Sequence, residues 1–300
     1  MTASPRRSAA LVRNAGARLA LCGVLGYTAL LCGCASLTGA SDATSKLADS
    51  GLAPLTGPPM PNQHSVRVGN LIVKSDDELS PGDPLIADLD RLRRNVTAAL
   101  ALPEATKDVT VYLFADEPAY RTFLEYRHPG LPPRRAYFVG TGTALHVYTF
   151  LGERTAEDLR HETVHGLLHA SLPGVPLWLD EGLAEYFETP TPGAANGDYP
   201  ELLARAVASG WRPDLARLES MDDFAALTRQ DYAESWAWVH LMMTGDRTVM
   251  RDHLASLGPG GSSPVSLTAR LAADRPSAPG PLLTAHVATL LGAGVLHAGG

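Results

Sequence analysis

The chain has 300 residues, of which 45% are hydrophobic and 19% are charged, and its formal net charge is −7. This is enough apolar material for one large domain or two small ones, and it excludes a disordered tail, a collagen-like repeat and a coiled coil. The acidic balance leaves no basic surface for nucleic acid, so a nucleic-acid partner is not expected. Three cysteines are too few for a disulfide scaffold.

Residues 1–33 have the pattern of an export signal. Four arginines and no acidic residue occupy 1–18, and the stretch 19–31 (LALCGVLGYTALL) is uncharged. As a helix this stretch would be about 20 Å long, which is shorter than the ~30 Å hydrocarbon core of a bilayer. A positive region before a short apolar region is typical of a cleaved signal peptide. The alternative is a short membrane anchor or a buried helix.

The end of this segment resembles the bacterial lipobox, in which a cysteine follows a Leu-x-Gly type tripeptide. The residues at 31–36 are LCGCAS, with Cys32 at a position that usually holds a small residue. In lipoproteins of this kind the cysteine is acylated and becomes the new N-terminus, and the match points to Cys34. The resemblance therefore implies a lipid-anchored protein of the bacterial cell envelope, at the outer face of the inner membrane or at the outer membrane.

Composition and pattern divide the rest of the chain into four parts. Residues 34–62 are rich in Ala, Ser, Thr, Pro and Gly, which is typical of a flexible tether. We predict an α/β subdomain at 63–152, a mainly helical subdomain at 153–256, and a Gly/Pro-rich segment with a final helix at 257–300. The apolar stretch 281–298 is interrupted by Gly and His, so we expect it to pack on the body rather than to span a membrane.

Hydrophobic periodicity predicts the elements in chain order, and together they give an α+β fold in which a small sheet with helices precedes a helical part. The first part should contain a strand at 65–75, a helix from Pro84 to just before Pro103, a strand at 108–114, a helix at 117–126, and a hairpin of 136–139 with 145–150. The second should contain helices at 155–171, 180–189, 200–209, 221–229, 231–243 and 266–273. Residues 155–158 (TAED) have the composition of a capping box that would start the first of these helices.

An H-E-x-x-H motif, residues 161–165, lies on the predicted helix 155–171. Residues four apart lie one turn apart on the same helical face, so His161 and His165 can point at one metal ion. A catalytic Zn²⁺ takes His nitrogens at about 2.0–2.1 Å, has three protein ligands and keeps one position for water. Glu162 is rotated by about 100° from His161, so it can reach that water as a general base without binding the metal.

The segment 178–188 (WLDEGLAEYFE) follows this helix. H-E-x-x-H followed by W-L-x-E-G-x-A-x-Y resembles the gluzincin metallopeptidases of clan MA, most closely the zinc aminopeptidases, and more broadly the peptidase MA-like domains of bacterial envelope proteins. The resemblance implies a zincin-like fold with one Zn²⁺ in the cleft between two subdomains. It also implies that Glu181 is the third zinc ligand. The link 166–180 is a few residues shorter here than in thermolysin or the aminopeptidases.

Glu185 and His169 lie close to these motifs in the sequence. Metal-bound histidines usually donate their other N–H to a carboxylate. In thermolysin-like enzymes a carboxylate four residues after the third ligand does this, so the resemblance gives that role to Glu185. The alternatives are that Glu185 replaces Glu181 as the ligand, or that both belong to a solvated acidic helix face. On a straight helix His169 lies about 12 Å from His161, too far to share one ion, so we expect it to pack beside or support the ligands.

The segment 230–240 (QDYAESWAWVH) resembles the downstream Tyr-containing helix of the family, which stabilises the developing oxyanion. Tyr232 is the first candidate for this role and His240 the second, and the alternative is an aromatic packing helix. The strand at 145–150 could border the cleft and hold an extended peptide, or it could be an interior strand.

The resemblance implies a zinc-dependent peptidase of the cell envelope that acts on a peptide or protein. Two alternatives remain open at this point. One is a binding or chaperone-like lipoprotein on a zincin scaffold without turnover, and the other is a zinc amidase that acts on the cell wall.

Overall fold

The structure, a computed structural model, describes residues 57–194, 198–261, 265–273 and 279–297. The expected signal at 1–33, the expected lipidation site Cys34 and most of the tether at 34–62 lie outside the described residues. Among the helices of the described part, none is both long enough and apolar enough to cross a membrane.

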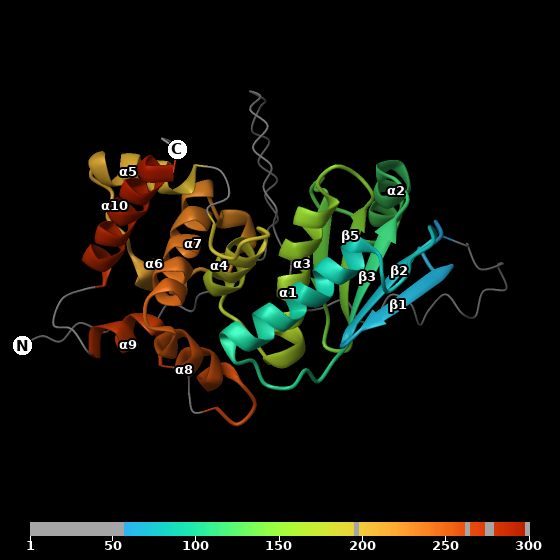
Figure 1. The fold of residues 1–300 in the computed structure, drawn as a ribbon, viewed down its shortest axis with the longest axis horizontal. Coiled ribbons are helices and arrows are strands. Elements are labelled where there is room, and N and C mark those ends of the chain that lie inside the picture. The colour runs from blue at the N-terminus through green and yellow to red at the C-terminus, as the bar shows by residue number, and fades with distance from the viewer. Residues whose placement is uncertain (1–56, 195–197, 262–264, 274–278, 298–300) are drawn as a thin grey trace, which may run out of the picture. The chain divides into compact units, whose positions relative to one another are not determined.

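A mixed five-stranded sheet occupies one side of the fold (Figure 1). Its strands, given in chain order, are β1 (His64–Val68), β2 (Leu71–Ser75), β3 (Val109–Phe114), β4 (Ala136–Gly140) and β5 (Leu145–Phe150). The spatial order is β1-β2-β3-β5-β4, with β2, β3 and β5 parallel to one another and the two edge strands antiparallel. The strand at 145–150 is therefore interior, and β4 forms the edge.

The helices of the described residues cover the sheet and continue beyond it. They are α1 (Pro84–Leu100), α2 (Glu117–Arg127), α3 (Thr155–Ser171), α4 (Leu177–Phe187), α5 (Tyr199–Ala208), α6 (Leu215–Glu219), α7 (Arg229–Thr244), α8 (Arg247–Leu257), α9 (Leu267–Ala273) and α10 (Gly280–His297). Helices α1 and α3 pack on one face of the sheet, and α2 packs on the other face (Figure 1). This is the expected α+β fold.

The main hydrophobic core runs from the sheet face under α1 and α3 into the helices α4 to α10. The predicted stripe of α1 is buried in it at Ile86, Leu89, Leu92, Val96 and Leu100. A smaller core of aromatic residues lies between α2 and the opposite sheet face. The final helix α10 packs against α5 and α7, as expected for a helix that belongs to the body.

Several predicted elements differ in the structure. The strand expected at 65–75 is two strands, because Gly69 has a φ of +60° and turns the chain into a hairpin. The helix expected at 221–229 is only the short 3₁₀ turn Phe224–Ala226, because Thr228 has extended backbone and serves as the N-cap of α7. Helices α6 and α8 were not predicted, and α4 begins at Leu177 rather than at 180.

The capping box expected at 155–158 is absent at the start of α3. Thr155 is already helical, and its hydroxyl donates to the carbonyl oxygens of Phe150 and Gly152 instead of capping the helix. The N-cap residue Arg154 makes no capping side-chain hydrogen bond. Thr155 therefore fastens the start of α3 to the end of β5, and this fixes the entry of the helix that carries the H-E-x-x-H motif.

Candidate metal centre

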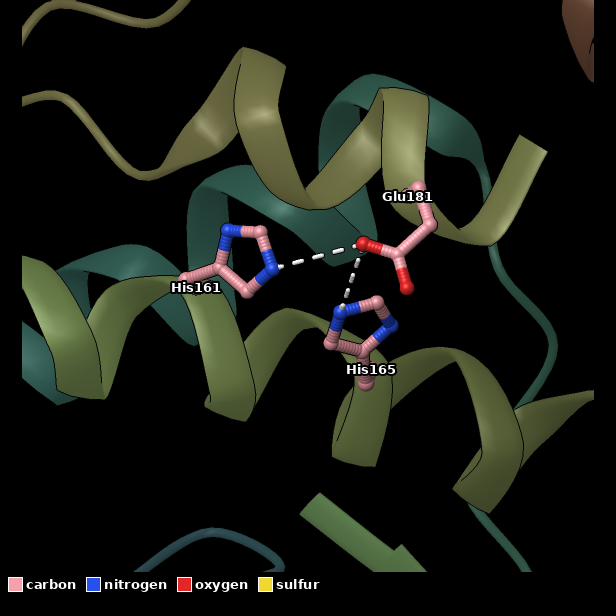
Figure 2. A group of neighbouring side chains, drawn as sticks. All are labelled: His161, His165 and Glu181. Atoms are coloured by element: carbon pink, nitrogen blue, oxygen red, sulfur yellow. Dashed lines mark ion pairs between the residues drawn. The ribbon is translucent and has the colours of Figure 1, made fainter. Parts of the chain in front are cut away.

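Helices α3 and α4 bring three predicted metal ligands together (Figure 2). His161 and His165 project from α3, and Glu181 reaches down from α4 toward the space between their rings. One oxygen of Glu181, Oε2, lies 3.6 Å from Nε2 of His161 and 3.9 Å from Nε2 of His165. Ligands of one tetrahedral zinc are about 3–4 Å apart, so these atoms have the spacing of a metal site.

The three residues are completely buried, each with 0% of its surface exposed. The Nε2 atoms of His161 and His165 have no hydrogen-bond partner among the described residues. A buried polar atom without a partner costs free energy, and a bound cation would satisfy both nitrogens at once. The group His161, His165 and Glu181 therefore can hold a metal ion, with two nitrogens and one carboxylate oxygen as donors.

Close backbone packing fixes both helices beside this group. Gly166 and Gly182 each directly follow a member of the metal group in the sequence. A Cβ atom on Gly182 would lie 2.6 Å from the main-chain oxygen of Ser235 in α7. A Cβ atom on Gly166 would lie 2.6 Å from Cγ1 of Val109 in β3. Only glycine permits these approaches, and they press α4 onto α7 and α3 onto the sheet.

The first histidine is supported by a residue that the sequence analysis did not select. Nδ1 of His161 lies 2.9 Å from Oε2 of Glu188. Glu185, to which the resemblance gave this role, accepts a 2.9 Å hydrogen bond from the hydroxyl of Tyr199 and lies with His161 and Glu188 in a second group that could hold a metal ion, so its role stays a prediction. Glu188 lies seven residues after Glu181, two turns along the same helical face, so the support comes one turn later than the family pattern implies.

The second histidine is supported by Asp180, which the sequence analysis also missed. Oδ1 of Asp180 lies 2.9 Å from Nδ1 of His165, and Oδ2 lies 3.0 Å from Nε2 of His169. Burial disfavours the charge of Asp180, but the two histidines hold its pKa well below the usual range. His169 is thus a supporting residue rather than a ligand, as expected. Phe138 of β4 stacks on both rings, with centroids 6.0 Å from His165 and 5.3 Å from His169.

The other predicted catalytic residues occupy different surroundings. Glu162 is fully buried in α3 beside His161, and Tyr232 is buried in the first turn of α7. Nδ1 of His240 lies 2.8 Å from Nε2 of His286 in α10, and its ring packs against Trp236 at 5.0 Å.

Burial, with a smaller contribution from His286, lowers the pKa of His240 to about 4. These contacts place His240 in a packing cluster between α7 and α10. For His240, they agree with the alternative that this helix is an aromatic packing helix. The role of Tyr232 stays a prediction.

We expect Asp180→Asn to weaken zinc binding about 10–100-fold, because carboxylates that hold ligating histidines contribute by this amount. The amide keeps the shape of the side chain but loses the charge that orients His165 and His169. The measurement is a competition titration with a chromophoric chelator. Asp77→Asn, at an exposed position away from the group, is the matched control. Equal zinc affinity in the two variants would contradict the supporting role of Asp180.

Zinc affinity should fall as the pH is lowered through neutrality. Burial lowers the pKa of His161 and of His165, but carboxylates outweigh burial and raise both, namely Glu181 and Glu188 for His161 and Asp180 for His165. Below these raised pKa values each imidazole carries a proton that a metal must displace. The affinity should therefore drop by up to about two decades per pH unit once both rings are protonated. An affinity that is constant between pH 8 and pH 5.5 in the same titration would contradict this.

No protein-family model matches the chain, and no curated protein matches it.

Proposed function

We propose that this chain is a zinc-dependent peptidase of the bacterial cell envelope, on a zincin-like scaffold. The observation that carries the proposal is the buried convergence of Glu181 with two imidazole nitrogens that have no hydrogen-bond partner among the described residues, those of His161 and His165. Two histidines and one glutamate are a ligand set of catalytic zinc sites, in which the fourth position is left for water. One Zn²⁺ is proposed for this group.

The protein residues around the ion divide the chemical work. When bound, zinc would polarise a substrate carbonyl and lower the pKa of a water molecule. Glu162 follows His161 directly and stands outside the ligand set, so it can take a proton from that water and pass it to the leaving amine. Tyr232 is the proposed donor that stabilises negative charge developing on the substrate oxygen.

The edge strand β4 is the proposed binding place for the substrate backbone. β4 pairs with β5 on one side, and no further strand of the described sheet pairs with its other side. Phe138, in the middle of β4, stacks on His165, so the strand runs beside the metal group. An extended peptide could add to this edge through main-chain hydrogen bonds. Such binding would present a peptide bond to the group without requiring a particular side chain.

The proposed location follows from the lipobox resemblance at Cys34. Acylation of this cysteine would anchor the chain to a membrane of the envelope, and the tether at 34–62 would hold the catalytic part away from the lipid surface. We expect Cys34→Ala to lose incorporation of radiolabelled palmitate and Cys32→Ala to keep it. This comparison tests the anchor separately from the catalytic proposal.

The test of the function is cleavage by the purified protein before and after removal of metal. We expect about one zinc per chain, cleavage of a peptide library, loss of cleavage after treatment with a chelator and recovery when zinc is added back. Products would be identified by mass spectrometry. Digestion of peptidoglycan fragments alone would support the amidase instead. Zinc binding without cleavage of either substrate would support the binding lipoprotein.

A further inference from the structure

A depression with a cavity volume of about 330 Å³ is lined by residues of α1, α4, α7 and α8. The C-terminal end of α1 lies beside α8 (Figure 1). Its walls include Phe187 and Met243, and its polar lining comes from Asn95, Tyr186, Arg247 and Arg251. No acidic residue lines it, whereas three other depressions in the described part each contain at least one carboxylate. The charged side chains of this lining are therefore all positive.

Two arginines of this depression lack a counter-ion within the described residues. Arg247 and Arg251 are one turn apart on α8, and neither forms an ion pair there, although arginines such as Arg217 and Arg229 do. The chain has a net charge of −7, so carboxylates are abundant. Like charges four residues apart on a helix repel each other. An anion placed between the two guanidinium groups would remove this repulsion.

Both guanidinium groups are held in place by main-chain oxygens. Nε of Arg247 donates to the carbonyl of Met243 at 2.7 Å. Nε and Nη2 of Arg251 donate to the carbonyls of Ala99 at 3.0 Å and Ala98 at 3.3 Å. Each guanidinium carries five N–H donors. These bonds therefore cap the last turns of α7 and α1 and still leave donors on both arginines for a ligand.

A neutral donor lies beside the two charges. Tyr186 of α4 lines the same depression as Arg247 and contributes a phenol to it. Asn95 of α1 contributes an amide to the same lining. Carboxylates and phosphates are recognised by such sets of fixed N–H and O–H donors.

We propose that this depression is an anion-binding site that takes a carboxylate or phosphate group carried on a small apolar body. The two guanidinium groups and the hydroxyl of Tyr186 bind the oxygens, and Phe187 and Met243 contact the apolar part. The site contains none of the metal-group residues, so this proposal can be tested independently of the peptidase proposal.

The test is calorimetric titration of the purified protein with three probes at matched ionic strength: sodium phosphate, sodium acetate and sodium hexanoate. We expect saturable binding, with hexanoate stronger than acetate because of the apolar walls. If phosphate binds most strongly, the natural ligand carries phosphate rather than carboxylate. Arg247→Gln should weaken the best probe at least about tenfold, since it removes charge-assisted hydrogen bonds.

Arg212→Gln is the matched control, because Arg212 also donates to main-chain carbonyls, forms no ion pair among the described residues and lines none of the depressions above. Tyr186→Phe, which removes only the hydroxyl, should weaken binding severalfold and guards against misfolding of the arginine variant. The proposal is overturned if no probe binds saturably, or if Arg247→Gln binds the best probe as tightly as Arg212→Gln.

Discussion

Glu162→Gln is expected to keep zinc and to lose at least about 100-fold in peptide-bond turnover, because general-base catalysis contributes about 10²–10⁴-fold. Glu162 is fully buried in α3 and lies outside the ligand group, so an amide of the same shape should leave His161 and His165 in place. The amide cannot accept a proton from water near neutral pH. The variant should therefore separate binding of the metal from use of the metal.

The measurement pairs zinc content with the initial rate on the best peptide from the library. Glu157→Gln is the control, because Glu157 lies in the first turn of the same helix and pairs with Arg154 near the surface. Unchanged turnover in Glu162→Gln would remove the general-base role. Loss of zinc in this variant, with zinc kept in Glu157→Gln, would instead make Glu162 part of the metal group.

The parts of the site that the sequence predicts are those that depend on local spacing. His161 and His165 share a face of one helix, and this follows from the periodicity alone. The prediction that Glu181 is the third ligand came from the family resemblance. The structure places one of its carboxylate oxygens within 4 Å of both imidazoles. Element boundaries were predicted where strong signals exist, as in α1, which begins at Pro84, and in α3, which ends at Ser171.

The supporting residues could not be read from spacing, because they depend on how α4 crosses α3. Asp180, one residue before Glu181, lies beside His165, and Glu188, seven residues after Glu181, lies beside His161. The family pattern pointed instead to Glu185, four residues after the ligand, which the structure pairs with Tyr199. The edge position of β4 is likewise a property of the sheet order, which no short-range pattern contains.

Removal of the third ligand should have the largest effect on the metal. We expect Glu181→Gln to weaken zinc binding by more than about 100-fold, which exceeds the effect expected for a supporting carboxylate. Zinc at 100 times its Kd would stabilise the wild-type fold by about 2.7 kcal/mol, and this stabilisation should disappear in the variant. The thermal unfolding midpoint with and without zinc measures the difference directly.

Glu185→Gln distinguishes the two assignments of the third ligand. Glu185 accepts a hydrogen bond from Tyr199, and it also lies with His161 and Glu188 in a second group that could hold a metal ion. Its amide oxygen could still accept the hydrogen bond from Tyr199, so Glu185→Gln should keep the zinc-dependent rise in the unfolding midpoint. If Glu185→Gln loses that rise and Glu181→Gln keeps it, the ligand is Glu185, and the register of α4 over α3 must then differ by one turn.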